Sequence, residues 1–241
     1  MIAALYVAPG GVYYGLDDVD PWPESRDART YVGPWPVVAH PPCARWGRYW
    51  FGGPSCRERK VKGDDGGCFA AALEAVRAYG GVLEHPEVSA AFATFGLRRP
   101  DREVGWQPAG DWIGWVCCVE QGHYGHRARK ATWLYAVAST LPALTWGASH
   151  QGGGGVRLDA GFHSAEERKL FRATLRAFRS NRTFDPEMKI AKNGYLDAME
   201  AATGCKLFER LGKRERNATP IAFRDVLLNI ARSCVSRSTV A

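Results

Sequence analysis

Two residues that follow apolar segments are suited to chemistry, and the first is Cys43. It comes after the segment Pro36–Ala39, His40 and two prolines. A strand ends at proline because proline cannot donate a ladder hydrogen bond and restricts the residue before it. Ligands of open α/β sheets bind beyond the carboxyl ends of the strands. Cys43 is therefore a candidate nucleophile, and the alternative is a half-buried structural thiol.

The second residue is Glu84, which follows Val82 and Leu83 in a segment that also ends at a proline. A glutamate inside a strand is partly buried, and the loss of water disfavours its charged form. We therefore expect a raised pKa for Glu84, which would suit it to hold or deliver a proton. The alternative is a structural glutamate that ties down a neighbouring loop.

The elements around these two residues follow the pattern of an α/β domain. The apolar segment 2–7 predicts a first buried strand, and the Pro-Gly-Gly sequence after it is either a simple turn or a place where backbone approaches a nucleotide-like ligand. Apolar residues at helical spacing predict a helix over 68–79. The segments 112–120 and 131–138 predict the two strands of a hairpin.

The last third of the chain has a different character. A glycine-rich segment, 149–162, predicts a linker or loop, and a helix is expected over 163–180. The stretch that follows is polar and basic with little periodicity. A final helix is predicted after Thr219 as N-cap, with Pro220 in its first turn.

Cationic and aromatic side chains gather in two segments, the stretch 44–67 and the turn between the hairpin strands. Each is either a solvated loop or a contact surface for nucleic acid, in which cations meet phosphates and aromatic rings stack on bases. The residues that we expect to contact nucleic acid are Arg45, Trp46, Arg48, Tyr49, Trp50 and Lys130.

Composition narrows the class of protein. The 241 residues carry a net charge of +7, which favours a polyanionic partner. The seven cysteines form no CxxC pair, and no N-terminal apolar stretch resembles a signal or membrane segment, so we expect a reducing, cytoplasmic setting without membrane association. The spacing of Cys43, Cys56 and Cys68 with His40 or His123 fits no compact zinc pattern, and no metal site is expected.

Five motifs, in this order along the chain, resemble those of the cytosine-C5 DNA methyltransferase family. ALYVAPGGVYYGL stands where the family has its glycine-rich cofactor turn, HPPC where it has the Pro-Cys nucleophile, and LEHP where it has a Glu-Asn-Val strand. HYGHRARKATWLY corresponds to the hairpin bearing QxRxR, and RNATP to the late RxxTP element. The chain looks most like the small, divergent members carried by bacterial viruses, which implies a bacterial host cell.

The resemblance implies a role for each matching residue. The Cys43 thiolate would add to carbon-6 of cytosine, Glu84 would be the partner of N3, and Arg127 and Arg129 would also be catalytic. The cation that lowers the pKa of the thiol would be Arg45, Arg127 or Arg129. The loop from Trp46 to Trp50 would fill the gap left by the flipped base. Contacts with S-adenosylmethionine are expected from Tyr6, Gly10, Gly11, Gly15, Asp20 and Pro42.

The resemblance also implies the architecture. We expect an α/β fold with a shortened, Rossmann-like methyltransferase sheet in a catalytic domain over 1–145. A small, irregular target-recognition region would follow over 146–215, and a helix in 216–241 would pack back on the catalytic domain. The expected function is methyl transfer to cytosine carbon-5 in DNA. The alternatives are another modification of that carbon with a different cofactor, and a DNA-binding protein with a relict site that performs no chemistry.

Overall fold

The computed structural model describes residues 1–47, 49–52, 56–149, 156–158, 169 and 209–234. They belong to two compact units. The first contains residues 1–126, 130–149 and the segment that starts at Thr219, and the second contains residues 127–129 and 150–218. The predicted helix over 163–180 and the predicted contact residue Arg48 lie outside the described residues.

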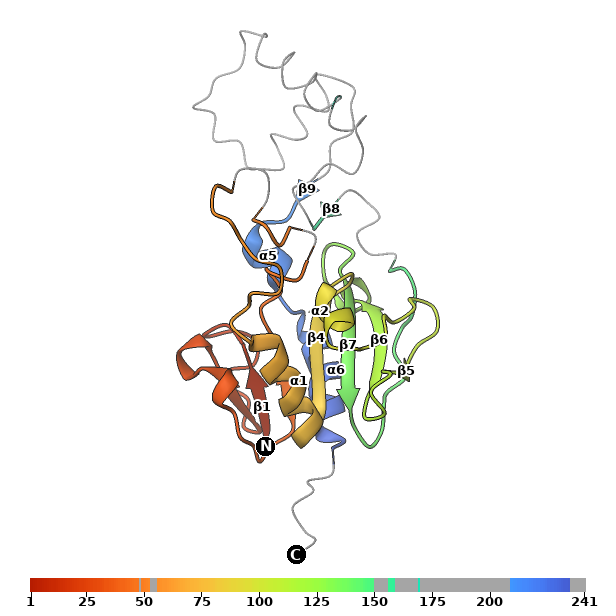
Figure 1. The fold of residues 1–241 in the computed structure, drawn as a ribbon. Helices are drawn as coiled ribbons and strands as arrows, with labels where there is room; N and C mark the ends of the chain where they lie inside the picture. Colours follow the sequence, from red (N-terminus) through yellow and green to blue (C-terminus); the bar gives the residue numbers. More distant parts are fainter. Residues whose placement is uncertain (48, 53–55, 150–155, 159–168, 170–208, 235–241) are drawn as a thin grey trace, which may run out of the picture. The chain divides into compact units, whose positions relative to one another are not determined.

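The first unit is built on a seven-stranded mixed sheet in the order β2-β1-β3-β4-β7-β6-β5 (Figure 1). Strands β2, β1, β3 and β4 run parallel, whereas β7 is antiparallel to both β4 and β6. The strands are β1 (Ile2–Leu5), β2 (Val19–Trp22), β3 (Val37–Ala39), β4 (Gly81–Pro86), β5 (Gln107–Pro108), β6 (Trp115–Glu120) and β7 (Ala131–Val137). The predicted α/β class and the hairpin of β6 and β7 are confirmed.

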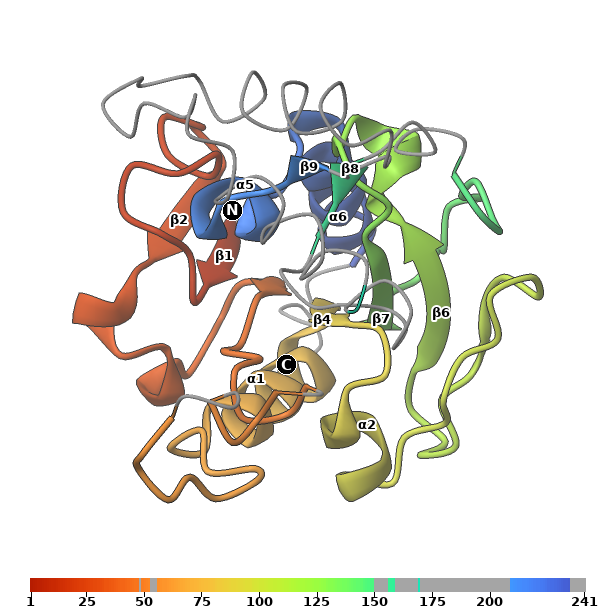
Figure 2. The same cartoon turned by 90° about the horizontal axis from the view of Figure 1, so that it is seen from above.

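Helices cover both faces of this sheet, as Figures 1 and 2 show. Successive side chains of a strand point to opposite faces, so Val37 packs with α1 (Cys68–Tyr79) and α2 (Ala90–Thr94), while Val38 packs with α6 (Ile221–Arg232). Helix α6 is therefore part of the core of the first unit, although it follows the second unit in the chain. Short 3₁₀ helices complete this unit: η1 (Glu24–Arg26), η2 (Ala28–Thr30) and η3 (Gln121–Tyr124).

The helix predicted over 68–79 is confirmed as α1, whose apolar residues face the sheet. The final helix begins at Ile221, and Pro220, rather than the predicted Thr219, occupies the N-cap position with extended backbone angles. The sequence patterns did not indicate α2 or β5, because a five-residue helix and a two-residue strand are too short to display a period.

The connection between β1 and β2 contains no helix and consists of turns. Parallel neighbours in an α/β sheet are usually joined by a crossover helix, so this half of the sheet is reduced. The described part of the second unit contains β8 (Val156–Arg157), which pairs in parallel with β9 (Glu209–Arg210), and the short helix α5 (Lys213–Asn217). No helix among the described residues has the length and apolar character needed to cross a bilayer.

The docking of α6 gives a prediction about stability. Phe223 is fully buried, and its ring packs against that of Tyr124 with 5.5 Å between centroids. Replacing Phe223 with Ala should lower the free energy of unfolding by about 3–5 kcal/mol, measured by denaturant titration. The matched control is Ile221→Ala on the exposed side of the same helix, which should change it by about 0.5 kcal/mol or less. Equal effects of the two substitutions would contradict the packing of α6 on the sheet.

Candidate active site

The candidate site lies where the parallel strands β1, β3 and β4 end. Strand β2 lies on one side of β1, and the next strands in the chain, β3 and β4, lie on the other side of β1. The strand order therefore reverses between β1 and β3. Ligands of open α/β sheets bind at such a reversal. The register pairs Ala39 with Leu83, so the next residues of the two strands, His40 and Glu84, lie side by side.

A chain of hydrogen bonds joins side chains from five segments at this point. The Tyr13 hydroxyl lies 2.8 Å from His40 Nε2, and His40 Nδ1 lies 3.0 Å from Glu84 Oε2. The Gln121 amide donates to Glu84 Oε1 at 3.2 Å and to the Thr132 hydroxyl at 2.9 Å. Both oxygens of Glu84 therefore have a partner at one end of the sheet.

These contacts reverse the pKa shift expected for Glu84. Burial alone raises its pKa, as predicted, but the hydrogen bond from His40 and the nearby positive charges, that of Lys130 first, together outweigh burial and lower the pKa to about 2. The expectation of a raised pKa was therefore wrong, because the partners of Glu84 are distant in sequence. At neutral pH the side chain is a carboxylate, which accepts hydrogen bonds and cannot donate one.

The next residue of β4, His85, faces the interior. It is fully buried, and neither of its ring nitrogens has a hydrogen-bond partner among the described residues. Burial lowers the pKa of His85 to about 4, against the opposing charge of Glu84. The Pro42 carbonyl, next to Cys43, also acts on the ring, but this contact lacks hydrogen-bond geometry. His85 is thus a neutral group beneath the turn that carries Cys43.

Cys43 is exposed in a turn that begins three residues beyond His40, and Pro42 before it is exposed as well. The Cys43 carbonyl accepts hydrogen bonds from the backbone N–H groups of Trp46 and Gly47. Trp46 is 5% exposed, packs against Phe69, and donates its indole N–H to Asp65 at 2.7 Å. The turn is therefore attached to the core by Trp46.

This attachment corrects one prediction, since a buried Trp46 cannot stack on a base. The other described aromatic residues of the segment are more accessible, and Tyr49 is 42% exposed while Trp50 is half-buried. The Arg45 guanidinium donates to the Trp50 carbonyl at 3.1 Å, which holds the two ends of this turn together.

The residues expected to bind the cofactor fit it only in part. Gly10 and Gly15 have positive φ angles, and a Cβ atom at either would meet nothing within 4 Å, so a ligand has room to approach the backbone there. Gly11 has no such space, because a Cβ atom would lie 2.9 Å from the Ala8 carbonyl. Tyr6, at the end of β1, has a φ of 60°, a strained conformation that is concentrated at functional sites.

Asp20, also expected to contact S-adenosylmethionine, is hydrogen-bonded within the protein. Its carboxylate accepts hydrogen bonds from the Arg26 guanidinium and the Trp22 indole. Burial raises the pKa of Asp20, but the hydrogen bonds from Arg26 and Trp22 and the charge of Arg26 together outweigh burial, and the net shift is downward. The turn at Gly10 and Gly15 is therefore open to a cofactor, whereas the carboxylate expected beside it is bound within the protein.

The cations of the hairpin turn divide between the two units. Arg127 and Arg129 belong to the second unit, in which Arg127 forms an ion pair with Glu215 at 2.8 Å. Lys130 belongs to the first unit, and its charge acts on Glu84. The first unit thus contains Cys43, Glu84 and Lys130, and the roles predicted for Arg127 and Arg129 stay predictions.

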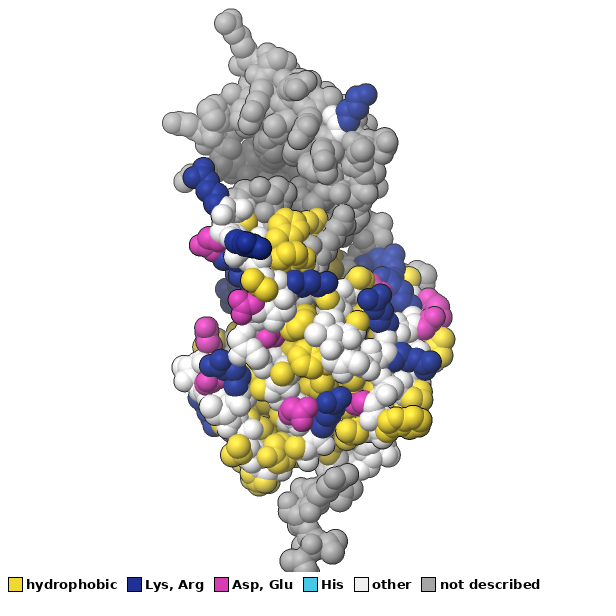
Figure 3. All heavy atoms as spheres, viewed as in Figure 1, with side chains coloured by type: hydrophobic (Ala, Val, Ile, Leu, Met, Phe, Trp, Pro, Cys, Tyr) yellow, Lys and Arg dark blue, Asp and Glu magenta, His cyan; other side chains and the backbone are white. Residues whose placement is uncertain are grey.

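Many other arginines of the first unit are paired with acidic groups. On the face drawn in Figure 3, Lys and Arg side chains occur together with Asp and Glu side chains. Arg26 pairs with Asp20, Arg102 with Glu87, and Arg232 with Asp18. The excess of positive charge therefore does not by itself mark one surface of this unit for nucleic acid.

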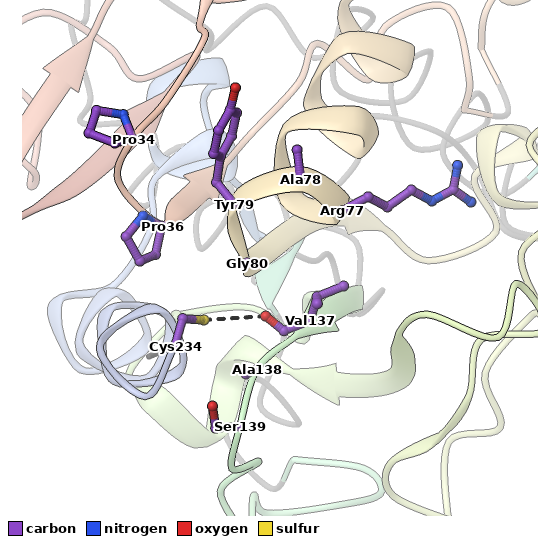
Figure 4. Close-up of a pocket in the computed structure, with 10 residues that line it drawn as sticks. All are labelled: Pro34, Pro36, Arg77, Ala78, Tyr79, Gly80, Val137, Ala138, Ser139 and Cys234. Carbon is purple, nitrogen blue, oxygen red and sulfur yellow. Dashed lines mark hydrogen bonds between the residues drawn. The ribbon is translucent and has the colours of Figure 1, made fainter. Parts of the chain in front are cut away.

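A pocket of about 200 Å³ lies at the opposite end of the sheet (Figure 4). It is lined by the end of α1, by Val137 at the end of β7 and by Cys234, whose thiol donates to the Val137 carbonyl at 3.2 Å. Because Val137 pairs with Gly81, the first residue of β4, this pocket lies at the amino ends of the parallel strands. It contains none of the residues predicted for the site.

The sequence reasoning missed Tyr13 and Gln121 and considered His40 only as a metal ligand. Among the described residues, no group of three or more His, Cys, Asp or Glu side chains is arranged to hold a metal ion. The position of His40 directly after β3 was the available signal, since it shares the strand end that singled out Cys43. Tyr13 and Gln121 had no comparable signal, because only the tertiary fold brings them to the site.

The ionised state of Glu84 predicts a dependence of stability on pH. Because its folded pKa is below the ordinary value, Glu84 stabilises the folded state above a pH of about 4.5, and this contribution is lost as the pH falls to about 2. The free energy of unfolding of the Glu84→Gln variant should therefore fall less over this range than that of the wild type, as measured by urea titration. Glu24→Gln, at an exposed position, should behave like the wild type. Parallel pH profiles for all three proteins would mean that Glu84 is not held ionised.

Comparison with models of known protein families finds no match, and comparison with curated protein sequences finds none either. What the chain does must therefore be inferred from the residues that its own fold brings together where β1, β3 and β4 end.

Proposed function

We propose that this chain modifies DNA at carbon-5 of cytosine, by methyl transfer from S-adenosylmethionine through a Cys43 thiolate. The observation that carries the proposal is the position of two residues. Cys43 follows β3 and Glu84 lies in β4, and these neighbouring parallel strands are beside the point where the strand order reverses. The five motifs of the cytosine-C5 methyltransferase family supply the chemistry for this pair. The mixed sheet agrees with a reduced, Rossmann-like methyltransferase fold.

The chemistry begins with the thiolate, which is the nucleophilic form of cysteine. Cys43 Sγ forms a bond to carbon-6 of cytosine, and the electrons of the 5,6 double bond move to carbon-5 as N3 takes up a proton from water. Carbon-5 then accepts the new group and releases its hydrogen as a proton to water. The electron pair left behind restores the double bond and expels the thiolate, and N3 returns its proton to water, so the enzyme is regenerated and the base is neutral again.

Glu84 contributes to this sequence as an acceptor. A carboxylate with a pKa of about 2 binds the protonated form of N3 and so favours the electron-rich state of the ring at carbon-5. His40 and Gln121 hold its two oxygens in place without consuming all of their lone pairs. The base reaches this carboxylate only when it leaves the duplex stack.

S-adenosylmethionine, when bound, supplies an electrophilic methyl group. Gly10 and Gly15 would border it, since their backbone is open to a ligand. The Asp20 carboxylate is already hydrogen-bonded to Trp22 and Arg26. This favours a second candidate function, the modification of the same carbon with another one-carbon or hydroxylating cofactor. Both candidates require Cys43 and Glu84, and they differ in the donor.

The first test is covalent capture on DNA that contains 5-fluorocytosine. Fluorine cannot leave carbon-5 as a cation, so an enzyme that has transferred a group stays bonded to carbon-6. With S-adenosylmethionine present, we expect a denaturant-resistant complex whose DNA-linked peptide contains Cys43, and no complex for Cys43→Ala. Cys56→Ser is the matched control, because Cys56 is a free cysteine of the same segment, and it should retain the complex.

The donor is tested separately by calorimetric titration of the full chain with S-adenosylmethionine, with and without DNA. Binding in the micromolar range corresponds to roughly 8 kcal/mol and supports methyl transfer. Absence of binding in both titrations excludes that donor. If the Cys43→Ala variant binds DNA as the wild type does while neither protein modifies it, the chain is a DNA-binding protein with a relict site.

A further inference from the structure

The glycine turn after β1 and the carboxylate on β4 are connected through one histidine. Tyr13 lies in the turn and is 3% exposed, and its hydroxyl contacts His40 Nε2. The other ring nitrogen, Nδ1, contacts Glu84 Oε2. The two rings are tilted by 51° with centroids 5.4 Å apart, so Tyr13 meets the edge of the imidazole that points away from Glu84.

We propose that Tyr13 and His40 are positioning residues for Glu84: the Tyr13 hydroxyl sets the tautomer of His40, and His40 fixes the carboxylate in the orientation that receives the base. The identity of the bound base rests on the proposed function. The hydrogen-bond arrangement itself does not, and it can be tested without a substrate.

The direction of each hydrogen bond follows from the groups involved. An ionised carboxylate can only accept, so His40 Nδ1 carries a proton and donates it to Glu84. In the neutral imidazole that the proposal assigns to His40, Nε2 is an acceptor, and Tyr13 is its donor. Burial raises the pKa of Tyr13 well above its ordinary value, and the nearby charge of Glu84 raises it further, so the phenol keeps its proton.

The turn that carries Tyr13 is itself fixed by α6, which covers the same face of the sheet. Arg224 of α6 donates to the carbonyl of Val12, the residue before Tyr13, at 2.8 Å. Tyr13 also packs in the core cluster that contains Phe223 and Leu227 of α6. The orientation of Glu84 thus depends on a turn that is anchored in the core, and the same turn contains Gly10 and Gly15, where a ligand has room.

The direct test is nitrogen NMR of protein labelled with ¹⁵N-histidine, in which the His40→Asn variant identifies the His40 signals. We expect Nδ1 to be protonated and Nε2 to be bare in the wild type. In Tyr13→Phe the donor to Nε2 is lost, the two tautomers mix, and the shift difference between the two nitrogens shrinks. Tyr14→Phe, an exposed tyrosine of the same turn, is the matched control and should leave the spectrum unchanged.

A proton on Nε2 in the wild type, or an unchanged spectrum for Tyr13→Phe, overturns the proposal. A second measurement covers the possibility that Tyr13→Phe unfolds. His40→Asn keeps an amide donor near the position of Nδ1, whereas His40→Leu removes it, so the rate of covalent capture on 5-fluorocytosine DNA should be roughly two- to tenfold higher for Asn than for Leu. Equal, measurable rates for the two variants also count against the proposal.

The outcomes separate this proposal from the proposed function. The expected NMR result without any covalent capture leaves the Tyr13, His40 and Glu84 arrangement in place and removes cytosine modification. Covalent capture on Cys43 together with the opposite tautomer of His40 supports cytosine modification and excludes the positioning role of Tyr13.

Discussion

The close approach of β3 and β4 is the constraint on which the site depends. Gly81 has a φ of +116°, and a Cβ atom at this position would lie 1.9 Å from the Val37 carbonyl, so only glycine allows the two strands to meet in this register. The register places His40 beside Glu84 and starts the Cys43 turn next to them. A slip by one residue would turn Glu84 to the opposite face of the sheet and separate these groups.

A buried carboxylate is costly unless its charge is compensated, and here compensation comes from several elements at once. His40 lies beyond β3, Gln121 lies in η3, and Lys130 directly precedes β7. None of them is a neighbour of Glu84 in sequence, so the state of this group is a property of the assembled sheet. A site of this kind is pre-organised, because its donors are fixed by strands rather than by a loop.

Local patterns predicted the parts of the fold that local physics determines. The amphipathic spacing of Phe69, Leu73 and Val76 was sufficient for α1, and the apolar segments after Ile113 and Ala131 predicted the hairpin. Long-range contacts decided the rest. Trp46 belongs to a basic, aromatic segment with no period, and only Asp65 and Phe69 reveal it as an anchor of the core. The pKa of Glu84 depends in the same way on His40, which is 44 residues distant.

The position of α6 has a consequence for how the chain folds during synthesis. One face of the sheet, formed by residues such as Ile2, Val38 and Val82, is covered by apolar side chains of α6 that the ribosome adds after the whole second unit. Until then the nascent chain presents a bare hydrophobic surface, which is prone to aggregate or to bind chaperones. The second unit is in effect an insertion within a domain, and a messenger that ends before α6 would encode a sheet that lacks this helix on one face.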